Sequence, residues 1–217
     1  MFTEFVFIRH GETDANRDGL LQGGKVDMPL NENGQKQAAA VAECLRDEHF
    51  DFSFASPLIR ARQTMEIIAA AHSEELVPQY DDALREWNCG DLDGLHWCEI
   101  KEKYPVESLA FSFERVEVQM PNGECGLVVQ SRVENFLKTV LEKCSGKRVL
   151  LVAHGGVLQR VVRFLTGPVC KHNMLPLADN ASITTFRFNH SYNAWQLTAL
   201  NRIEHLKNLP LHQSRVS

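Results

Sequence analysis

Two histidines occupy equivalent places in the sequence, each directly after a short apolar run and directly before a glycine. His10 follows residues 5–8 and Arg9, and His154 follows residues 149–153. Continuous runs of apolar and β-branched residues are typical of strands buried on both faces of a sheet. If both strands lie in one parallel sheet, their carboxyl ends bring two imidazoles and one guanidinium to a single crevice, where open α/β sheets bind ligands.

The residues next to these histidines favour a phosphate-like ligand. Gly11 and Gly155 let a ligand approach the backbone, and a helix predicted to begin after Gly156 points its first N–H groups at the same place. Guanidinium forks, imidazoles and helix-end amides all neutralise phosphoryl oxygens. For either histidine alone, a strand-end residue bonded to a nearby carbonyl is an equally good interpretation, but the occurrence of both favours a site.

The elements around these two strands predict an α/β fold. Apolar residues with helical spacing follow Asn31, the expected N-cap, and recur over residues 126–144, while another helix is expected with Pro57 in its first turn. Shorter strand patterns are predicted at 52–55, 76–79, 182–188 and 195–200. The alternation of strands and helices predicts a three-layer α/β/α sandwich with a mostly parallel sheet and an antiparallel edge strand.

One domain is expected. A chain of 217 residues, of which 44% are hydrophobic and 24% charged, has the composition of an ordinary globular domain with a sizeable core. We expect this domain to span residues 1–205 and to include a weakly patterned helical insertion at about 96–120. Residues 206–217 are polar and are predicted to form a loosely held C-terminal tail.

Composition and charge exclude several functional classes. The formal net charge of −5 and the isoelectric point of about 6.0 argue against general binding of nucleic acid or of an anionic membrane surface. The six cysteines are scattered and form no Cys-x-x-Cys pair, which argues against a disulfide framework or a structural zinc site. No segment has the length and apolarity of a membrane span or a signal peptide. A cytoplasmic location is therefore expected.

Sequence motifs beyond the two histidines resemble the histidine phosphatase superfamily, which includes cofactor-dependent phosphoglycerate mutases. Six blocks occur in the family's order: Arg9-His10-Gly11-Glu12-Thr13-x-x-Asn16; Gln22-Gly23 with Asp27-x-Pro29-Leu30 and Gly34; Ala55-Ser56-Pro57-Leu58-x-Arg60-Ala61-x-Gln63-Thr64; Leu84-Arg85-Glu86-x-x-x-Gly90; Val152-Ala153-His154-Gly155-Gly156; and Asn180-Ala181-Ser182-Ile183. The blocks cover most of the chain, and the resemblance implies the phosphoglycerate mutase-like fold.

The resemblance also implies a role for each matched residue. His10 is the expected nucleophile, which forms a phosphohistidine intermediate. Arg9, Arg60 and His154 are expected to surround the phosphoryl group and stabilise its charge. Glu86 is the expected general acid, then the base that activates water. Further contacts to phosphate or substrate are implied for Asn16, Gln22, Gly23 and the Gly155 amide. The family needs no metal, and no cofactor is expected for this chain.

The reaction type follows less directly from the resemblance. Mutases of this family usually carry longer insertions between the blocks, and the first block here ends in Glu12-Thr13, as in many phosphatases. We therefore expect a phosphomonoesterase that acts on a small phosphorylated metabolite, with a phosphoglycerate mutase as the first alternative. Three residues separate Gly23 from Asp27, where many members have two. This spacing resembles fructose-2,6-bisphosphatases, and Lys25 is a candidate ligand for a second phosphate.

Two further alternatives are a non-catalytic phosphate-binding module and a metal-dependent hydrolase. The first is disfavoured because all the chemical residues are present. The second draws only on Asp91 and Asp93, which are common types of turn residue. Substrate selectivity is expected from residues 98–120, which lie outside the six blocks, so the motifs assign neither the substrate nor an oligomeric state.

Overall fold

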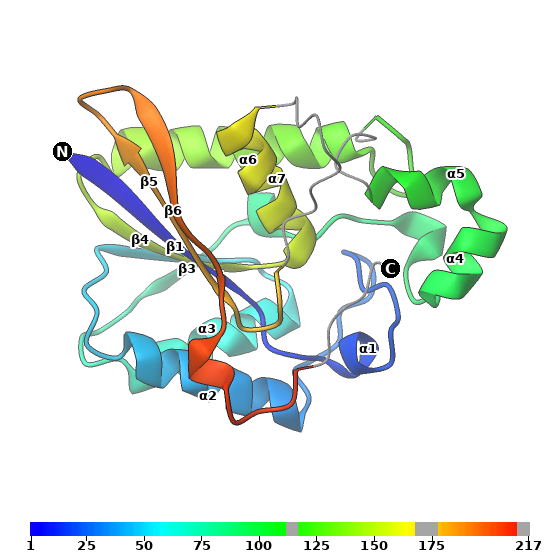
Figure 1. Ribbon diagram of the computed structural model, residues 1–217, viewed down its shortest axis with the longest axis horizontal. Coiled ribbons are helices and arrows are strands. Elements are labelled where there is room, and N and C mark those ends of the chain that lie inside the picture. The colour runs from blue at the N-terminus through cyan, green and yellow to red at the C-terminus, as the bar shows by residue number, and fades with distance from the viewer. Residues whose placement is uncertain (112–116, 168–177, 212–217) are drawn as a thin grey trace.

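The computed structural model describes residues 1–111, 117–167 and 178–211. In these ranges one sheet has the strand order β3-β2-β4-β1-β5-β6 (Figure 1). The strands are β1 (Phe2–Arg9), β2 (Phe52–Ala55), β3 (Pro78–Tyr80), β4 (Arg148–Ala153), β5 (Ile183–Asn189) and β6 (Ala194–Arg202). The first four strands are mutually parallel, and β5 and β6 extend the sheet in antiparallel pairing.

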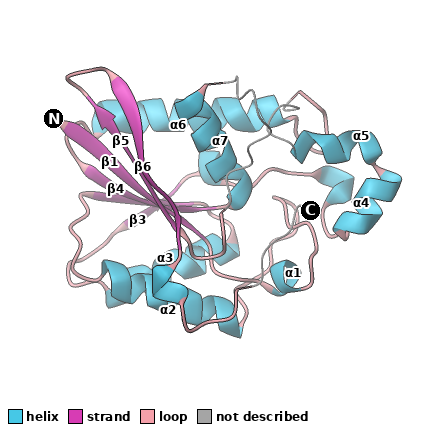
Figure 2. Ribbon diagram, in the orientation of Figure 1, coloured by secondary structure: helices cyan, strands magenta, loops and turns pink. Residues whose placement is uncertain are grey.

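Helices cover both faces of the sheet. They are α1 (Asp14–Arg17), α2 (Glu32–Leu45), α3 (Ile59–Ala71), α4 (Trp97–Lys103), α5 (Pro105–Ser108), α6 (Gly126–Lys143) and α7 (Gly155–Thr166). Figure 2 shows α2 and α3 on one side of the strands and α6 and α7 on the other. The predicted three-layer α/β/α sandwich is thereby confirmed, with two antiparallel strands at its edge.

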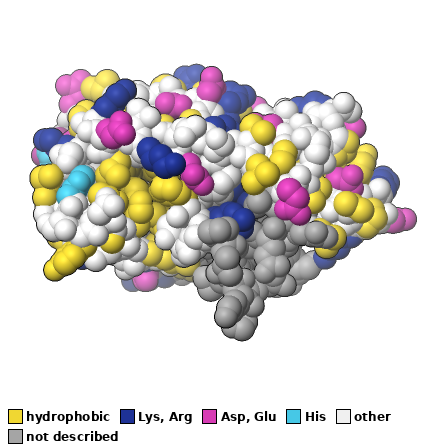
Figure 3. All heavy atoms as spheres, turned by 90° about the horizontal axis from the view of Figure 1, so that it is seen from above, with side chains coloured by type: hydrophobic (Ala, Val, Ile, Leu, Met, Phe, Trp, Pro, Cys, Tyr) yellow, Lys and Arg dark blue, Asp and Glu magenta, His cyan; other side chains and the backbone are white. Residues whose placement is uncertain are grey.

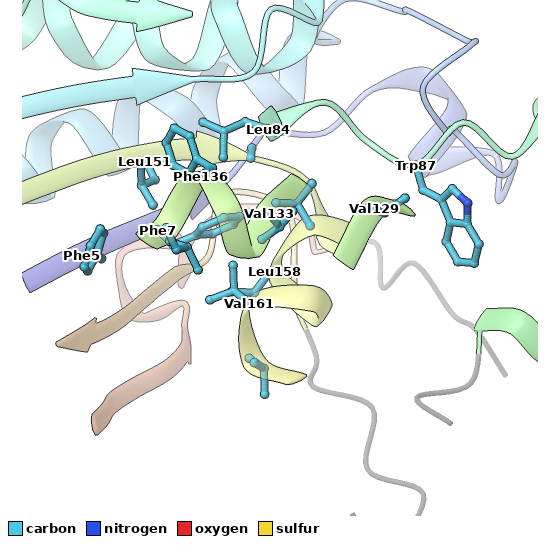
Figure 4. Packing of buried hydrophobic residues seen from close by; sticks show 14 of the residues in the cluster. Phe5, Phe7, Leu84, Trp87, Val129, Val133, Phe136, Leu151, Leu158 and Val161 are labelled. Atoms are coloured by element: carbon cyan, nitrogen blue, oxygen red, sulfur yellow. The ribbon is translucent and has the colours of Figure 1, made fainter. Parts of the chain in front are cut away.

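Strict alternation along β1 supplies both cores, because successive side chains of a strand point to opposite faces. Phe5 and Phe7 pack in the cluster with α6 and α7, whereas Val6 and Ile8 pack in the cluster with α2 and α3. Figure 4 shows the first cluster extending from β1 past α6 to Trp87. All four β1 side chains are at most 2% exposed, and burial of each contributes about 1.5–3 kcal/mol.

Local signals explain where the helices begin. The Asn31 side chain caps α2 by accepting a hydrogen bond from Gly34 N at 2.8 Å, as predicted. The prediction that Pro57 lies in the first turn of α3 is wrong, because Leu58 is extended and α3 begins at Ile59. The Asp27 carboxylate takes over the capping function and accepts from Ile59 N at 2.8 Å.

The predicted insertion at about 96–120 is largely helical over residues 97–111, whereas its described end, 117–120, is not helical. It contains α4, α5 and a 3₁₀ turn at Leu109–Phe111, and it lies beyond the end of the sheet toward which β1 runs (Figure 1). The Phe111 ring lies 5.3 Å from the Trp87 ring and 4.8 Å from the Trp97 ring, measured between centroids. Aromatic packing therefore ties the insertion to the segment that carries Glu86.

The C-terminal segment is held more firmly than its polar sequence predicted. Leu206 is completely buried in the cluster of α2 and α3. Asn33 Nδ2 and Gln37 Nε2, both on α2, donate to the Pro210 carbonyl at 3.1 and 3.3 Å. The expectation of a loose tail from residue 206 is therefore wrong as far as Pro210, and residues 212–217 lie outside the described part.

The surface of the described residues is charged but mixed. On the face in Figure 3, Lys and Arg side chains are interspersed with Asp and Glu, so neither sign dominates there. Within the described ranges, no helix combines the length and the apolar character that crossing a bilayer requires.

Candidate active site

His10 and His154 lie side by side because their strands are neighbours. The parallel register of β1 and β4 pairs Arg9 with Ala153, the residues that directly precede the two histidines. The backbone N–H of His10 donates to the Ala153 carbonyl at 3.0 Å, and the two imidazole centroids are 5.1 Å apart. Both side chains are buried. The fold therefore joins the two motifs at the carboxyl ends of adjacent strands.

Hydrogen bonds determine which nitrogen of His10 carries the proton. Nδ1 lies 2.7 Å from the Gly11 carbonyl, which can only accept, so Nδ1 is the donor. Burial, together with the charges of Arg60 and Arg9, lowers the pKa of His10 well below its usual value, and the ring is neutral at pH 7. Nε2 therefore keeps its lone pair, which accepts a hydrogen bond from Arg60 Nε at 3.2 Å.

His154 is held through its other ring nitrogen. Its Nε2 lies 2.8 Å from the Ser56 hydroxyl, which stands directly after β2. Its Nδ1 is buried and has no hydrogen-bond partner among the described residues. Burial, followed by the charge of Arg60, lowers the pKa of His154 well below its usual value. Nδ1 thus remains available for a hydrogen bond to a ligand.

Arg60 reaches the histidines from the first turn of α3 and is completely buried. Its Nη1 and Nη2 donate to the carbonyls of Val26 and Gly23, each at 3.2 Å. Burial lowers the pKa of Arg60 to about 10, so the guanidinium stays charged at pH 7. Asp27 is 3.7 Å away and 41% exposed. A buried cation with such a weakly placed counter-charge favours an anionic ligand.

Arg9 adds a second cation at the start of α7. It ends β1, is largely buried, and donates from Nη1 to the Ala178 carbonyl. Burial lowers the pKa of Arg9, whereas the carboxylates of Glu86 and Asp179 act in the opposite direction. A Cβ placed on Gly155 would lie 3.6 Å from Arg9 Nε. The guanidinium therefore lies against Gly155, the first residue of α7. The N–H groups in the first turn of a helix have no partner within the helix.

The segment after β1 contributes Asn16, which lies in α1, and Gln22. Asn180 Nδ2 lies within hydrogen-bond distance of Asn16 Oδ1, at 3.0 Å, and of the His10 carbonyl, at 3.1 Å. Gln22 Oε1 accepts from the Thr13 hydroxyl at 2.6 Å, while its buried Nε2 has no partner in the described part of the chain. Asn16 is thus linked to the backbone of His10, and Gln22 retains a donor for a ligand.

Glu86 is fixed against the other side of the α7 N-terminus. Its Oε2 accepts from Gly156 N at 3.0 Å, and its Oε1 accepts from Trp87 N at 2.9 Å. A Cβ on Gly156 would lie 2.4 Å from Glu86 Oε1, so this approach requires glycine. Arg132 on α6 supports the segment by donating to the carbonyls of Ala83 and Glu86 at 2.7 and 3.4 Å.

The structure brings the predicted side chains of His10, Arg60 and His154 together. It also adds four supporting residues to which the sequence assigned no role: Ser56, Asp93, Arg132 and Asn180. Ser56 and Asn180 lie inside motif blocks, so their positions carried a signal. By sequence alone, Asp93 is an ordinary turn residue and Arg132 is part of a predicted helix. Their contacts join segments far apart in the chain, so no local pattern could reveal them.

Two weaker candidates stay on the periphery. The Lys25 side chain is exposed, and its backbone N–H donates to Asp93 Oδ2 at 3.1 Å. Asp91 is also exposed and accepts from Asn122 Nδ2 at 2.9 Å. In the ranges that the structure describes, no three His, Cys, Asp or Glu side chains are grouped so that they could hold a metal ion.

The chemistry available to this pocket follows from its groups. A neutral imidazole with a lone pair lies beside two buried guanidinium groups and a second imidazole. Cations in a pocket of low dielectric bind anions strongly and stabilise charge that develops on them. A partly buried carboxyl at the helix N-terminus is able to exchange protons. The arrangement suits nucleophilic transfer of an anionic group through nitrogen.

These features define a class of protein. The family model described as the histidine phosphatase superfamily (branch 1) matches residues 5–202, and the chain belongs to this family. The resemblance carried by the six sequence blocks is thereby confirmed. Because the match spans nearly the whole chain, it includes the strands and helices that position the site.

Relatives within the family perform different reactions. The metal-independent phosphoserine phosphatase of Arabidopsis thaliana is 33% identical over 209 residues, covering 95% of this chain and 84% of the relative. A 2,3-bisphosphoglycerate-dependent phosphoglycerate mutase of Cytophaga hutchinsonii is 33% identical over 169 residues, covering 74% of this chain and 76% of the relative. The solved structure of an alpha-ribazole phosphatase from Shigella flexneri matches with a TM-score of 0.78 and 28% identity, over 92% of this chain and 96% of that one.

Proposed function

We propose that this protein is a phosphomonoesterase that hydrolyses a small phosphorylated metabolite through a phosphohistidine on His10. The observation that carries this proposal is the state of His10: a neutral ring whose Nε2 lone pair faces a buried cation. A nitrogen that must attack phosphorus needs that lone pair. A dianion next to Arg60 also fills the need of this buried charge for a partner.

In the first step His10 attacks the phosphoryl group. A bond forms between Nε2 and phosphorus while the bond from phosphorus to the ester oxygen breaks. Arg9, Arg60 and His154 bind the phosphoryl oxygens and stabilise the charge that spreads over them in the transition state. The proton for the leaving oxygen comes from Glu86, because the dianion beside this carboxyl favours its protonated form.

In the second step water restores the enzyme. The Glu86 carboxylate takes a proton from water, the water oxygen bonds to phosphorus, and the bond between phosphorus and His10 Nε2 breaks. Inorganic phosphate leaves, and Glu86 holds a proton again. We infer that Asn16, Gln22, Gly23 and the Gly155 amide position the substrate in both steps. The buried donor Gln22 Nε2 supports this role.

His154 is proposed to serve the phosphoryl group as a donor. In the protein without ligand, burial and neighbouring cations lower the pKa of His154. A bound dianion opposes both effects, so it favours protonation of the ring. The Nδ1 atom without a partner among the described residues supports such a contact.

A screen for phosphate release tests the proposal. The panel contains phosphoserine, sugar phosphates, phosphoglycerates and nucleotides, with His10→Ala as the blank. We expect at least one monoester to be hydrolysed by the wild type in the presence of a chelator, with a loss of at least about 10³-fold in the variant. Equal rates in the two proteins contradict the proposal, and loss of activity in chelator points to a metal-dependent hydrolase.

A phosphoglycerate mutase is the second candidate, supported by the relative from Cytophaga hutchinsonii. Both reactions share the phosphohistidine but differ in whether water or a second substrate accepts the phosphoryl group. Conversion of 3-phosphoglycerate to 2-phosphoglycerate faster than phosphate release identifies a mutase. Fructose 2,6-bisphosphate belongs in the same panel. Three residues, among them Lys25, separate Gly23 from Asp27, and this spacing resembles that of fructose-2,6-bisphosphatases. We further infer that the activity is cytoplasmic and uses neither metal nor cofactor.

A further inference from the structure

Asp93 binds the loop that carries Gly23 through two hydrogen bonds. Its Oδ1 accepts from Gly23 N at 2.8 Å, and its Oδ2 accepts from Lys25 N at 3.1 Å. The carboxylate follows a 3₁₀ turn at Gly90–Leu92 and lies 70 residues from Gly23 in sequence. Both of its oxygens are thus used to fix the backbone of one loop.

The same loop orients Arg60. The carbonyls of Gly23 and Val26 accept hydrogen bonds from Arg60 Nη2 and Nη1, each at 3.2 Å. Arg60 Nε in turn donates to His10 Nε2 at 3.2 Å. A continuous path of hydrogen bonds and peptide units therefore leads from the Asp93 carboxylate to the nitrogen of His10.

Tight packing leaves this loop little freedom. A Cβ on Gly23 would lie 2.2 Å from Asp93 Oδ1 and 2.5 Å from the Trp87 carbonyl. Gly24 N donates to the same Trp87 carbonyl at 2.8 Å. The loop is therefore clamped against the segment that also carries Glu86. A change at Asp93 removes or alters the hydrogen bonds that hold the backbone of this loop at Gly23 and Lys25.

We propose that Asp93 is a positioning residue for phosphoryl transfer: its carboxylate holds the loop of residues 23–26 in the shape that aims the Arg60 guanidinium at the phosphoryl group. The inference rests on the proposed function of the same site. Displacement of a catalytic group by about 1 Å is able to cost about 10²-fold in rate. A residue that touches no substrate thereby acquires a large effect on the reaction.

Burial makes the charge state of Asp93 sensitive to pH. Burial raises the pKa of Asp93 to about 6, and the neighbouring carboxylate of Glu86 acts in the same direction. Arg60 faces Asp93 as a cation, and the buried Cys89 thiol is a further neighbour. Because the folded pKa lies above the ordinary value of 3.8, the ionised form costs stability at pH 7, and this cost declines as the pH falls from about 6 toward 3.8.

Asp93→Asn tests the inference, with Asp91→Asn as the matched control from the same turn. An amide presents only one acceptor oxygen, so one of the two loop N–H groups loses its partner. We expect kcat/KM for the best substrate to fall about 10- to 100-fold, while Asp91→Asn stays within about twofold of the wild type. The melting temperature of Asp93→Asn should not fall, because the substitution removes a buried charge. A kcat/KM within twofold of the wild type overturns the proposal.

The pH dependence separates positioning from a merely structural role. The ratio of kcat/KM between the wild type and Asp93→Asn should decline toward one as the pH falls below about 6, where Asp93 in the wild type becomes protonated. Groups common to both proteins cancel in this ratio. A ratio that stays constant from pH 5 to 8, or a loss of activity that tracks a loss of melting temperature, contradicts the inference.

Two measurements distinguish a failure of the positioning role of Asp93 from a failure of the proposed function. Affinity for inorganic phosphate, measured by calorimetry at constant pH, should fall about tenfold in Asp93→Asn whether or not the protein is a hydrolase. In the wild type, the NMR amide shifts of Gly23 and Lys25 should titrate near pH 6, which requires no variant. Flat shifts overturn the role of Asp93, whereas an active His10→Ala variant overturns the proposed reaction and this role with it.

Discussion

The carboxyl ends of β1 and β4 have nearly the same local sequence but hold their histidines in different ways. Both histidines precede a glycine, are buried, and stand on adjacent parallel strands. At His10 the backbone fixes Nδ1 and leaves Nε2 with a lone pair; at His154 a serine hydroxyl holds Nε2 and leaves Nδ1 open. The difference shows that the residue type alone does not define the role of a histidine. The role depends on which ring nitrogen the fold engages in a hydrogen bond.

Both histidines share a cationic, buried setting that keeps them neutral without ligand. The causes are the same in kind, namely desolvation and the nearby arginines. Only His10, however, directs its lone pair at Arg60. We therefore expect loss of His10 to remove the chemistry, and loss of His154 to weaken binding of the phosphoryl group and stabilisation of its transition state.

The largest effect is expected for His10→Ala. In the proposed mechanism His10 is the nucleophile and has no substitute, so phosphate release should fall at least about 10³-fold, to the level of the blank. Labelled substrate should leave an acid-labile, alkali-stable phosphoryl label on the wild type and none on the variant. A label that persists on His10→Ala shows that another residue is the nucleophile, and it contradicts the role assigned to His10 in the comparison with His154.

A smaller loss is expected for His154→Gln. The amide keeps a hydrogen-bonding group but is unable to become cationic, so we expect kcat/KM to fall by about 10²-fold. The phosphoryl label should still form on His10, because its lone pair is unchanged. Quantifying the label in rapid-quench experiments checks this. If His154→Gln abolishes labelling while His10→Ala retains it, the roles of the two strand ends are reversed.

The pH dependence of stability sharpens the electrostatic part of the comparison. Because the pKa of each buried histidine is lowered on folding, the unfolded chain takes up protons below about pH 6.5 that the folded protein does not. Acidification should therefore destabilise the protein by up to about 1.4 kcal/mol per pH unit for each histidine. The free energy of unfolding in urea, measured between pH 5 and 7.5, should depend less steeply on pH in His154→Gln than in the wild type. An unchanged pH dependence contradicts the assigned cause.

The smallest effect is expected for Ser56→Ala. The hydroxyl lies within hydrogen-bond distance of His154 Nε2, and in the described part of the site it contacts none of the other side chains proposed to be catalytic. Its loss should cost about 1–2 kcal/mol of stability and at most about tenfold in kcat/KM. Ser53→Ala on β2 is the matched control, because Ser53 is also buried but lies within the strand. Equal losses of activity for the two variants argue against the Ser56 contact.

The strongest local patterns predicted their elements well. The apolar runs of β1 and β4 and the cap at Asn31 were visible because strand alternation and helix capping are local properties. The errors lay where distant contacts decide. Pro57 lies outside α3, and the polar segment after residue 206 is packed onto α2. In the latter case, buried Leu206 and two hydrogen bonds from α2 to the Pro210 carbonyl anchor what composition suggested was loose.

The sequence by itself determined the residue types of the site and their order, since each block is short and continuous. It could not determine how these residues meet. Arg60 could be interpreted as a solvated side chain until the fold placed it, completely buried, beside His10. Protonation states depend on burial and on charges brought together from separate elements. The tautomer of His10, the open nitrogen of His154 and the clamp made by Asp93 were therefore decided only by the tertiary structure.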